Sequence, residues 1–153
     1  MSRKLAREIA FKVIFSDNLQ NDNDKSEEVQ IDNISSLVDT LTNDEDFVIS
    51  NENLSDEDKK YINEVCIGVS SRTSELDEKI KTYLKGWTMD RIGKTDLAIL
   101  RLAIFEILYR EDIPYKVSIN EAVELAKMYC DDASPSFING LLAALINSLP
   151  NDN

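Results

Sequence analysis

The stretch DLAILRLAIFEILYR, residues 96–110, decides the fold of this chain. It is apolar at nearly every position, contains neither Gly nor Pro, and lacks the alternation of apolar and polar residues that is typical of a strand. A helix that is apolar around its whole girth has to be buried on all sides. The stretch therefore predicts the central helix of a helical bundle.

The boundaries of this helix and of two C-terminal helices are predicted from capping patterns. Thr95 is placed to cap the central helix. Ser118 and Glu121 form the pattern S-x-x-E of a capping box, which opens the helix INEAVELAKMYC. Ser-Pro at 134–135 opens the last helix, in which we interpret Gly140 as a close contact between two helices.

The N-terminal half also reads as helix. Apolar residues at helical spacing predict helices over 3–19 and 26–41, with a loop over 41–54 between the second helix and the next. Ser55, followed by three acidic residues, predicts the start of a third helix. The pattern leaves open whether that helix continues or restarts near Thr73. With four Gly and three Pro in 153 residues, the sequence predicts a single all-α domain, a compact bundle of about seven helices.

The charge of the chain is segregated. The net charge is −12, yet residues 1–16 hold four basic residues and only one acidic residue, whereas 17–60 hold fourteen acidic and three basic residues. Uniform acidity would argue against a nucleic-acid ligand, but a segregated pattern permits one at the positive end. The basic residues of that end are Arg3, Lys4, Arg7 and Lys12.

No catalytic or metal-binding pattern emerges. The chain has no His, no G-x-S-x-G elbow and no phosphate-binding loop, and its acidic runs lack EF-hand spacing. Cys66 falls on the apolar row of its helix and is predicted to be a core residue, and Cys130 stands far from it. We expect no metal, no cofactor and no membrane segment, and two cysteines without a signal peptide suggest a reducing cytoplasm.

Three blocks closely resemble the NusB family of bacterial transcription antitermination factors. They are DLAILRLAIFEILY, IPYKVSINEAVELAK and FINGLLAAL, in the family's order and with its spacing. The block KLAREIAFKVIF is similar to the family's first helix. Together the resemblance covers most of 3–19 and 61–147.

The resemblance implies a fold, a function and partners. The fold would be two small helical subdomains, about 1–70 and 71–149, without enzymatic activity. The protein would bind boxA, a single-stranded RNA element of ribosomal RNA leaders, together with the ribosomal protein NusE. The complex would join RNA polymerase and other Nus factors and support read-through of terminators in the cytoplasm. Some relatives form homodimers, and the sequence leaves the oligomeric state open.

The resemblance also implies candidate RNA-binding residues. In the family an Arg-rich N-terminal stretch contributes to the RNA surface, and Leu5 stands where relatives often have a further Arg. A Tyr near the RNA path could stack on an unpaired base. The candidates are Arg3, Lys4, Arg7, Lys12, Tyr83 and Lys85. Three alternatives stay open: Arg7 could pair with Glu8 within the protein, Arg3 and Lys4 could belong to a frayed, solvated terminus, and Tyr83 could belong to the core.

The partner-binding surface is assigned to the connector before the central helix, with Asp90, Arg91 and Asp96 as candidates. An acidic residue in the first turn of a helix is favourable in any case, so Asp96 has a structural alternative. Two other functions remain: a fragment of an RNA cytosine methyltransferase with a similar helical domain, and a helical adaptor that binds only proteins. With so few positive charges, we expect weak RNA binding alone and tight binding only with a basic partner.

Overall fold

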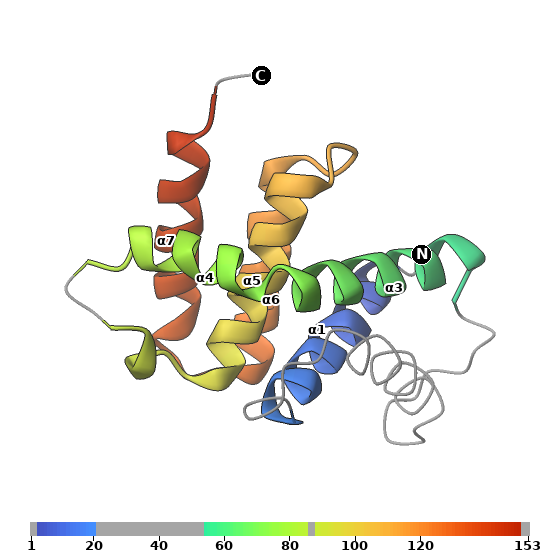
Figure 1. Ribbon diagram of the computed structural model, residues 1–153, viewed down its shortest axis with the longest axis horizontal. Coiled ribbons are helices and arrows are strands. Elements are labelled where there is room, and N and C mark those ends of the chain that lie inside the picture. Colours follow the sequence, from blue (N-terminus) through green and yellow to red (C-terminus); the bar gives the residue numbers. More distant parts are fainter. Residues whose placement is uncertain (1–2, 21–53, 86–87, 151–153) are drawn as a thin grey trace. The chain divides into compact units, whose positions relative to one another are not determined.

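The computed structural model describes residues 3–20, 54–85 and 88–150, and the regular elements in these ranges are all helical. The predicted all-α class is therefore confirmed. The elements are α1 (Arg3–Gln20), α3 (Asp56–Ser71), α4 (Thr73–Thr82), the 3-10 turn η3 (Met89–Arg91), α5 (Lys94–Tyr109), α6 (Tyr115–Tyr129) and α7 (Ser134–Ser148) (Figure 1). The helix predicted over 26–41 and the loop over 41–54 lie outside the described residues, except for Leu54 at the loop's end.

Two compact units make up the chain, with the boundary between Arg72 and Thr73. The same boundary settles the question of the third helix, because α3 ends at Ser71 and α4 restarts at Thr73. Each unit is described by itself below. Among the described helices, none combines the length and the apolar character needed to cross a bilayer.

In the first unit, α1 and α3 pack side by side (Figure 1). Their apolar rows meet, and the predicted inward residues are buried: Ile9, Val13, Ile62, Val65 and Cys66 are each at most 1% exposed. Ser55 caps α3 as predicted. Its hydroxyl oxygen accepts a bond from the Asp58 N–H at 3.1 Å, and the Asp58 carboxylate accepts one from the Ser55 N–H at 3.4 Å, which completes a capping box.

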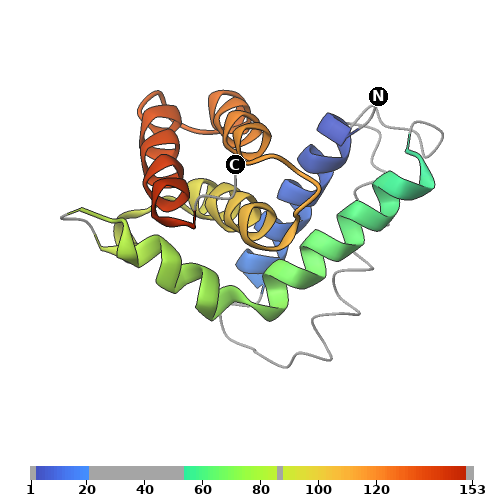
Figure 2. The same cartoon turned by 90° about the horizontal axis from the view of Figure 1, so that it is seen from above.

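In the second unit, α5 is the central helix, as the sequence predicts. Every residue over 98–107 is buried, because α4, α6 and α7 all pack against it. Figure 2 shows α4 on one side of α5 and α6 on another. The helix α7 packs against both α5 and α6.

Two capping predictions and one predicted helix contact are wrong. The residue that precedes α5 is Gly93, not Thr95, and α6 begins at Tyr115 after Pro114, so that Ser118 lies within the helix. Ser118 is buried, and its hydroxyl donates to Glu106 Oε1 at 2.8 Å instead of capping. Gly140 is exposed, and a Cβ added there would meet nothing within 4 Å, so it is not a close helix contact.

Candidate nucleic-acid interface

Two arginines of α1 share one aromatic ring of α3. Arg3 and Arg7 are one helical turn apart, and their guanidinium carbons lie 4.6 Å and 5.7 Å from the ring centroid of Tyr61. Both distances fall within the range of a cation–π contact. Because Tyr61 is only 1% exposed, the ring fixes the basic end of α1 to the interior of the first unit.

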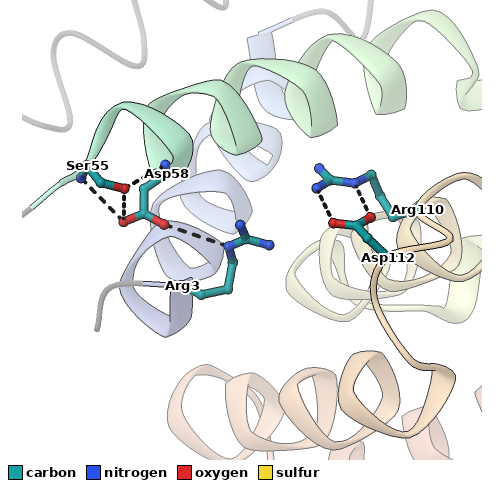
Figure 3. Close-up of polar contacts among 5 residues, drawn as sticks. All are labelled: Arg3, Ser55, Asp58, Arg110 and Asp112. Carbon is teal, nitrogen blue, oxygen red and sulfur yellow. Dashed lines mark hydrogen bonds and ion pairs between the residues drawn. The ribbon is translucent and has the colours of Figure 1, made fainter.

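The carboxylate of Asp58 completes this cluster. Its Oδ1 lies 3.7 Å from Arg3 Nε, and its Oδ2 accepts a bond from the Ser55 hydroxyl at 3.0 Å. Figure 3 shows the carboxylate between the capping serine and the arginine. One buried acid thus stabilises the start of α3 and holds a cation of α1. We call Arg3, Arg7, Asp58 and Tyr61 the arginine cluster.

The four predicted RNA-binding residues of α1 differ in exposure. Lys4 is exposed, the Arg3 side chain is 32% exposed, and Lys12 is half-buried. Lys4 and Lys12 are two turns apart and lie on one stripe of the helix. Arg7 is only 4% exposed, so its guanidinium faces the protein interior. Lys4 and the exposed part of Arg3 are the cations of this end that a ligand reaches most directly.

The remaining two candidates belong to the second unit. Tyr83 follows the end of α4 and is half-buried, and its hydroxyl donates to Ser148 Oγ at 2.6 Å. The Ser148 hydroxyl in turn donates to the Leu145 carbonyl oxygen at 2.7 Å. The ring is therefore tethered to the end of α7 without being a core residue. Lys85 is exposed.

The predicted partner-binding residues fall into two groups. Asp90 and Arg91 are exposed on η3, and the Asp90 carboxylate accepts a hydrogen bond from the Thr88 hydroxyl. Asp96 lies in the first turn of α5, half-buried, and its carboxylate accepts bonds from the Ser134 hydroxyl at 2.8 and 3.0 Å. Asp96 therefore ties the start of α7 to the start of α5, which gives it an internal role.

Sequence reasoning missed the residues that organise these surfaces. Asp58 was used only as one of the acidic residues after Ser55, and no role was named for Tyr61, although both are buried in the first turns of α3. Arg101, in the middle of the apolar helix α5, is 8% exposed and donates to both carboxylate oxygens of Asp77 at 2.8 Å. A charged residue inside an otherwise apolar helix is the signal that could have indicated such a pair.

The cysteines show no reactive site. Cys66 is buried as predicted, its thiol donates to the Ala10 carbonyl oxygen at 3.8 Å, and burial with the nearby charge of Asp17 raises its pKa. Partial burial, together with a hydrogen bond to Asp96, raises the pKa of Cys130 to about 12. Both thiols therefore stay protonated near neutral pH. Within the described ranges, no three His, Cys, Asp or Glu residues gather in a way that could hold a metal ion.

Comparison with known proteins identifies close relatives. The profile described as "NusB family" matches residues 4–147. The chain is 44% identical over 146 residues to the transcription antitermination protein NusB of Acetivibrio thermocellus, covering 95% of this chain and 89% of that protein. It is 38% identical over 148 residues to the protein of the same name from Clostridium botulinum, covering 95% of this chain and all of the relative. These names indicate no catalytic activity, and they favour antitermination over a methyltransferase fragment or an adaptor.

Solved structures share the fold. NusB of T. maritima superposes with a TM-score of 0.77 at 27% identity, covering 97% of this chain and 92% of that chain. A structure described as antitermination factors NusB and NusE in complex with dsRNA superposes with a TM-score of 0.75 at 22% identity, covering 96% of this chain and 97% of that one. At that identity the second likeness shows the fold alone.

Proposed function

Since this chain belongs to the NusB family, we propose that it is a transcription antitermination factor that binds boxA-type single-stranded RNA of ribosomal RNA leaders together with NusE. The bound complex joins RNA polymerase and other Nus factors and supports read-through of terminators. The protein acts in the cytoplasm and catalyses no reaction. The observation that carries this proposal is the family match over 4–147, and the 44% identical relative bears the antitermination name.

The basic end of α1 is the proposed phosphate-binding surface. Lys4 and Arg3 supply exposed positive charge, and Lys12 extends the same side of the helix by two turns. Arg7 is buried against Tyr61, and its proposed part is to add positive charge from beneath the surface. In the second unit, Tyr83 offers a ring for stacking on an unpaired base and Lys85 an exposed cation.

The small number of phosphate contacts that this surface can make indicates that RNA binding needs a partner. Each phosphate contact to a single strand contributes about −0.7 to the slope of log K against log salt, so three or four contacts give about −2 to −3. That is modest against a net charge of −12. A basic partner such as NusE adds positive charge and further base contacts, and the acidic bulk of this protein speeds its association. Asp90 and Arg91, exposed on η3, are proposed for the partner-binding surface.

A titration of boxA-type RNA, with and without NusE, tests the proposal. We expect weak binding by the protein alone and much tighter binding with NusE, and equal affinity in both cases would refute the role of the partner. The double variant Lys4→Glu, Lys12→Glu should weaken partner-assisted binding more than tenfold and flatten the salt slope by about 1.4, since two phosphate contacts are lost.

The matched control is the double variant Lys59→Glu, Lys60→Glu, which makes the same charge change at two exposed lysines of α3 in the same unit. It should leave RNA affinity nearly unchanged. If the Lys4→Glu, Lys12→Glu variant binds RNA like the wild-type protein, the N-terminal surface is wrong. If neither protein binds RNA but both bind NusE, the protein is an adaptor and not an RNA-binding factor.

A further inference from the structure

The arginine cluster contains two side chains whose place in RNA binding the proposed function does not explain. Asp58 is 4% exposed and Tyr61 is 1% exposed, so neither can touch RNA itself. Both contact Arg3, whose side chain remains 32% exposed. The question is what a buried carboxylate does beside the cation that is proposed to meet a phosphate.

The geometry restricts the Arg3 side chain at two points. Its Nε is buried and lies 3.7 Å from Asp58 Oδ1, and its guanidinium carbon lies 4.6 Å above the Tyr61 ring. A free arginine side chain at a helix end would lose rotamer entropy on binding a phosphate. A side chain already held by a ring and a carboxylate has lost part of that freedom before RNA arrives.

We infer that Asp58 and Tyr61 are positioning residues that hold the Arg3 guanidinium in its RNA-binding orientation. This inference rests on the proposed function. Asp58 is itself fixed, because its other carboxylate oxygen accepts bonds from the Ser55 hydroxyl and N–H in the capping box (Figure 3). The start of α3 and the basic end of α1 are therefore coupled through one carboxylate.

Positioning by Asp58 and simple electrostatics predict opposite changes in RNA affinity for one substitution. Asp58 places a negative charge beside Arg3, and this charge repels a phosphate. If charge alone mattered, Asp58→Asn would tighten RNA binding. If Asp58 positions Arg3, the same variant weakens binding by about three- to tenfold, as expected for the coupling between residues in contact.

Asp56→Asn is the matched control. Asp56 is exposed in the same first turn of α3, so this variant removes the same charge from the same helix end without touching the arginine cluster. It should bind RNA with unchanged or slightly higher affinity.

A double-mutant cycle with Arg3→Ala distinguishes positioning from a general loss of structure. We expect Asp58→Asn to weaken binding of boxA-type RNA, in the presence of NusE, in the wild-type background but to change it less than twofold in the Arg3→Ala background. Wild-type or tighter binding by Asp58→Asn overturns the inference. An equal loss in both backgrounds also overturns it, since the effect would then not act through Arg3.

The failure of the proposed function would look different. If the wild-type protein with NusE does not bind the RNA, the proposed function and this inference fall together. If the wild-type protein binds and Arg3→Ala weakens binding, but the cycle shows no coupling, only the inference falls.

The NMR signal of the Arg3 Nε–H gives a readout without RNA: we expect slow exchange and a ring-current shift in the wild-type protein. Both should be lost in Asp58→Asn, and an unchanged signal would contradict the positioning.

Discussion

Removing the Asp77 carboxylate should destabilise the second unit strongly, because Arg101 cannot be left without its partner. Arg101 is 8% exposed and donates two bonds of 2.8 Å to the two oxygens of Asp77. Breaking a buried ion pair by deleting one partner costs about 3–5 kcal/mol. The Asp77 side chain is 21% exposed, so water can partly replace the carboxylate, and the lower end of the range applies. We expect Asp77→Ala to lose about 3 kcal/mol of unfolding free energy.

The measurement is urea unfolding followed by far-UV circular dichroism, with thermal melting in parallel. For a chain of this length, about 3 kcal/mol corresponds to a Tm lower by roughly 6–12 °C. Deleting the other partner should cost less: in Arg101→Met the remaining Asp77 carboxylate can be hydrated, and the methionine fills the apolar space. We expect a loss of about 1 kcal/mol.

Glu78→Ala is the control on the same helix. Its side chain is 73% exposed and lies 3.4 Å from the Lys81 ammonium, an exposed pair that contributes little. The change in unfolding free energy should stay within about 0.5 kcal/mol. The reasoning is refuted if Asp77→Ala costs no more than this control, or if Arg101→Met costs more than Asp77→Ala.

Three further predictions concern single positions. Gly140→Ala should raise the unfolding free energy by about 0.5–1 kcal/mol, because a Cβ there meets nothing within 4 Å and the helix gains propensity; an unchanged or lower midpoint in urea would contradict this. Ser118→Ala should lose about 1–3 kcal/mol in the same assay, because it removes a bond to the buried Glu106 carboxylate. Alkylation of Cys130 by iodoacetamide should be slow at pH 8 and keep rising with pH beyond 9, since its pKa is raised to about 12 and only the thiolate reacts; a rate that levels off near pH 9 would argue against it.

Local chemistry predicted much of the fold, and tertiary contacts decided the rest. The helical class, the central place of α5 and the Ser55 cap all depend on residues close in sequence, so the sequence revealed them. The pattern around Ser118 wrongly predicted a helix cap, because the helix begins earlier, after Pro114. The Ser118 hydroxyl therefore lies within α6 and donates to the buried Glu106 carboxylate of α5. Helical spacing in the sequence does not predict a hydrogen bond between Ser118 and Glu106, which are twelve residues apart and on different helices.

The candidate site shows the same division. The sequence located the basic end of α1, since charge segregation is visible without a structure. It could not distinguish Arg7 from Lys4, although one is buried and the other exposed. Their difference depends on the ring of Tyr61 on α3, fifty-four residues beyond Arg7 in the chain. The burial of a charged side chain depends on which residues pack over it, and these residues can be distant in the sequence.

The polar residues of α5 explain how a helix that is apolar all round can hold a single orientation. Hydrophobic burial alone does not favour one rotation of such a helix over another. Asp96, Arg101 and Glu106 are spaced five residues apart, which turns each about 140° from the last at 3.6 residues per turn. Each contacts a different neighbour: Ser134 of α7, Asp77 of α4 and Ser118 of α6, respectively. Rotating α5 would break all three contacts and leave charged groups buried without partners, at a cost that apolar packing could not recover. The charges that look out of place in the apolar stretch are therefore the residues that fix which side of α5 meets each neighbouring helix.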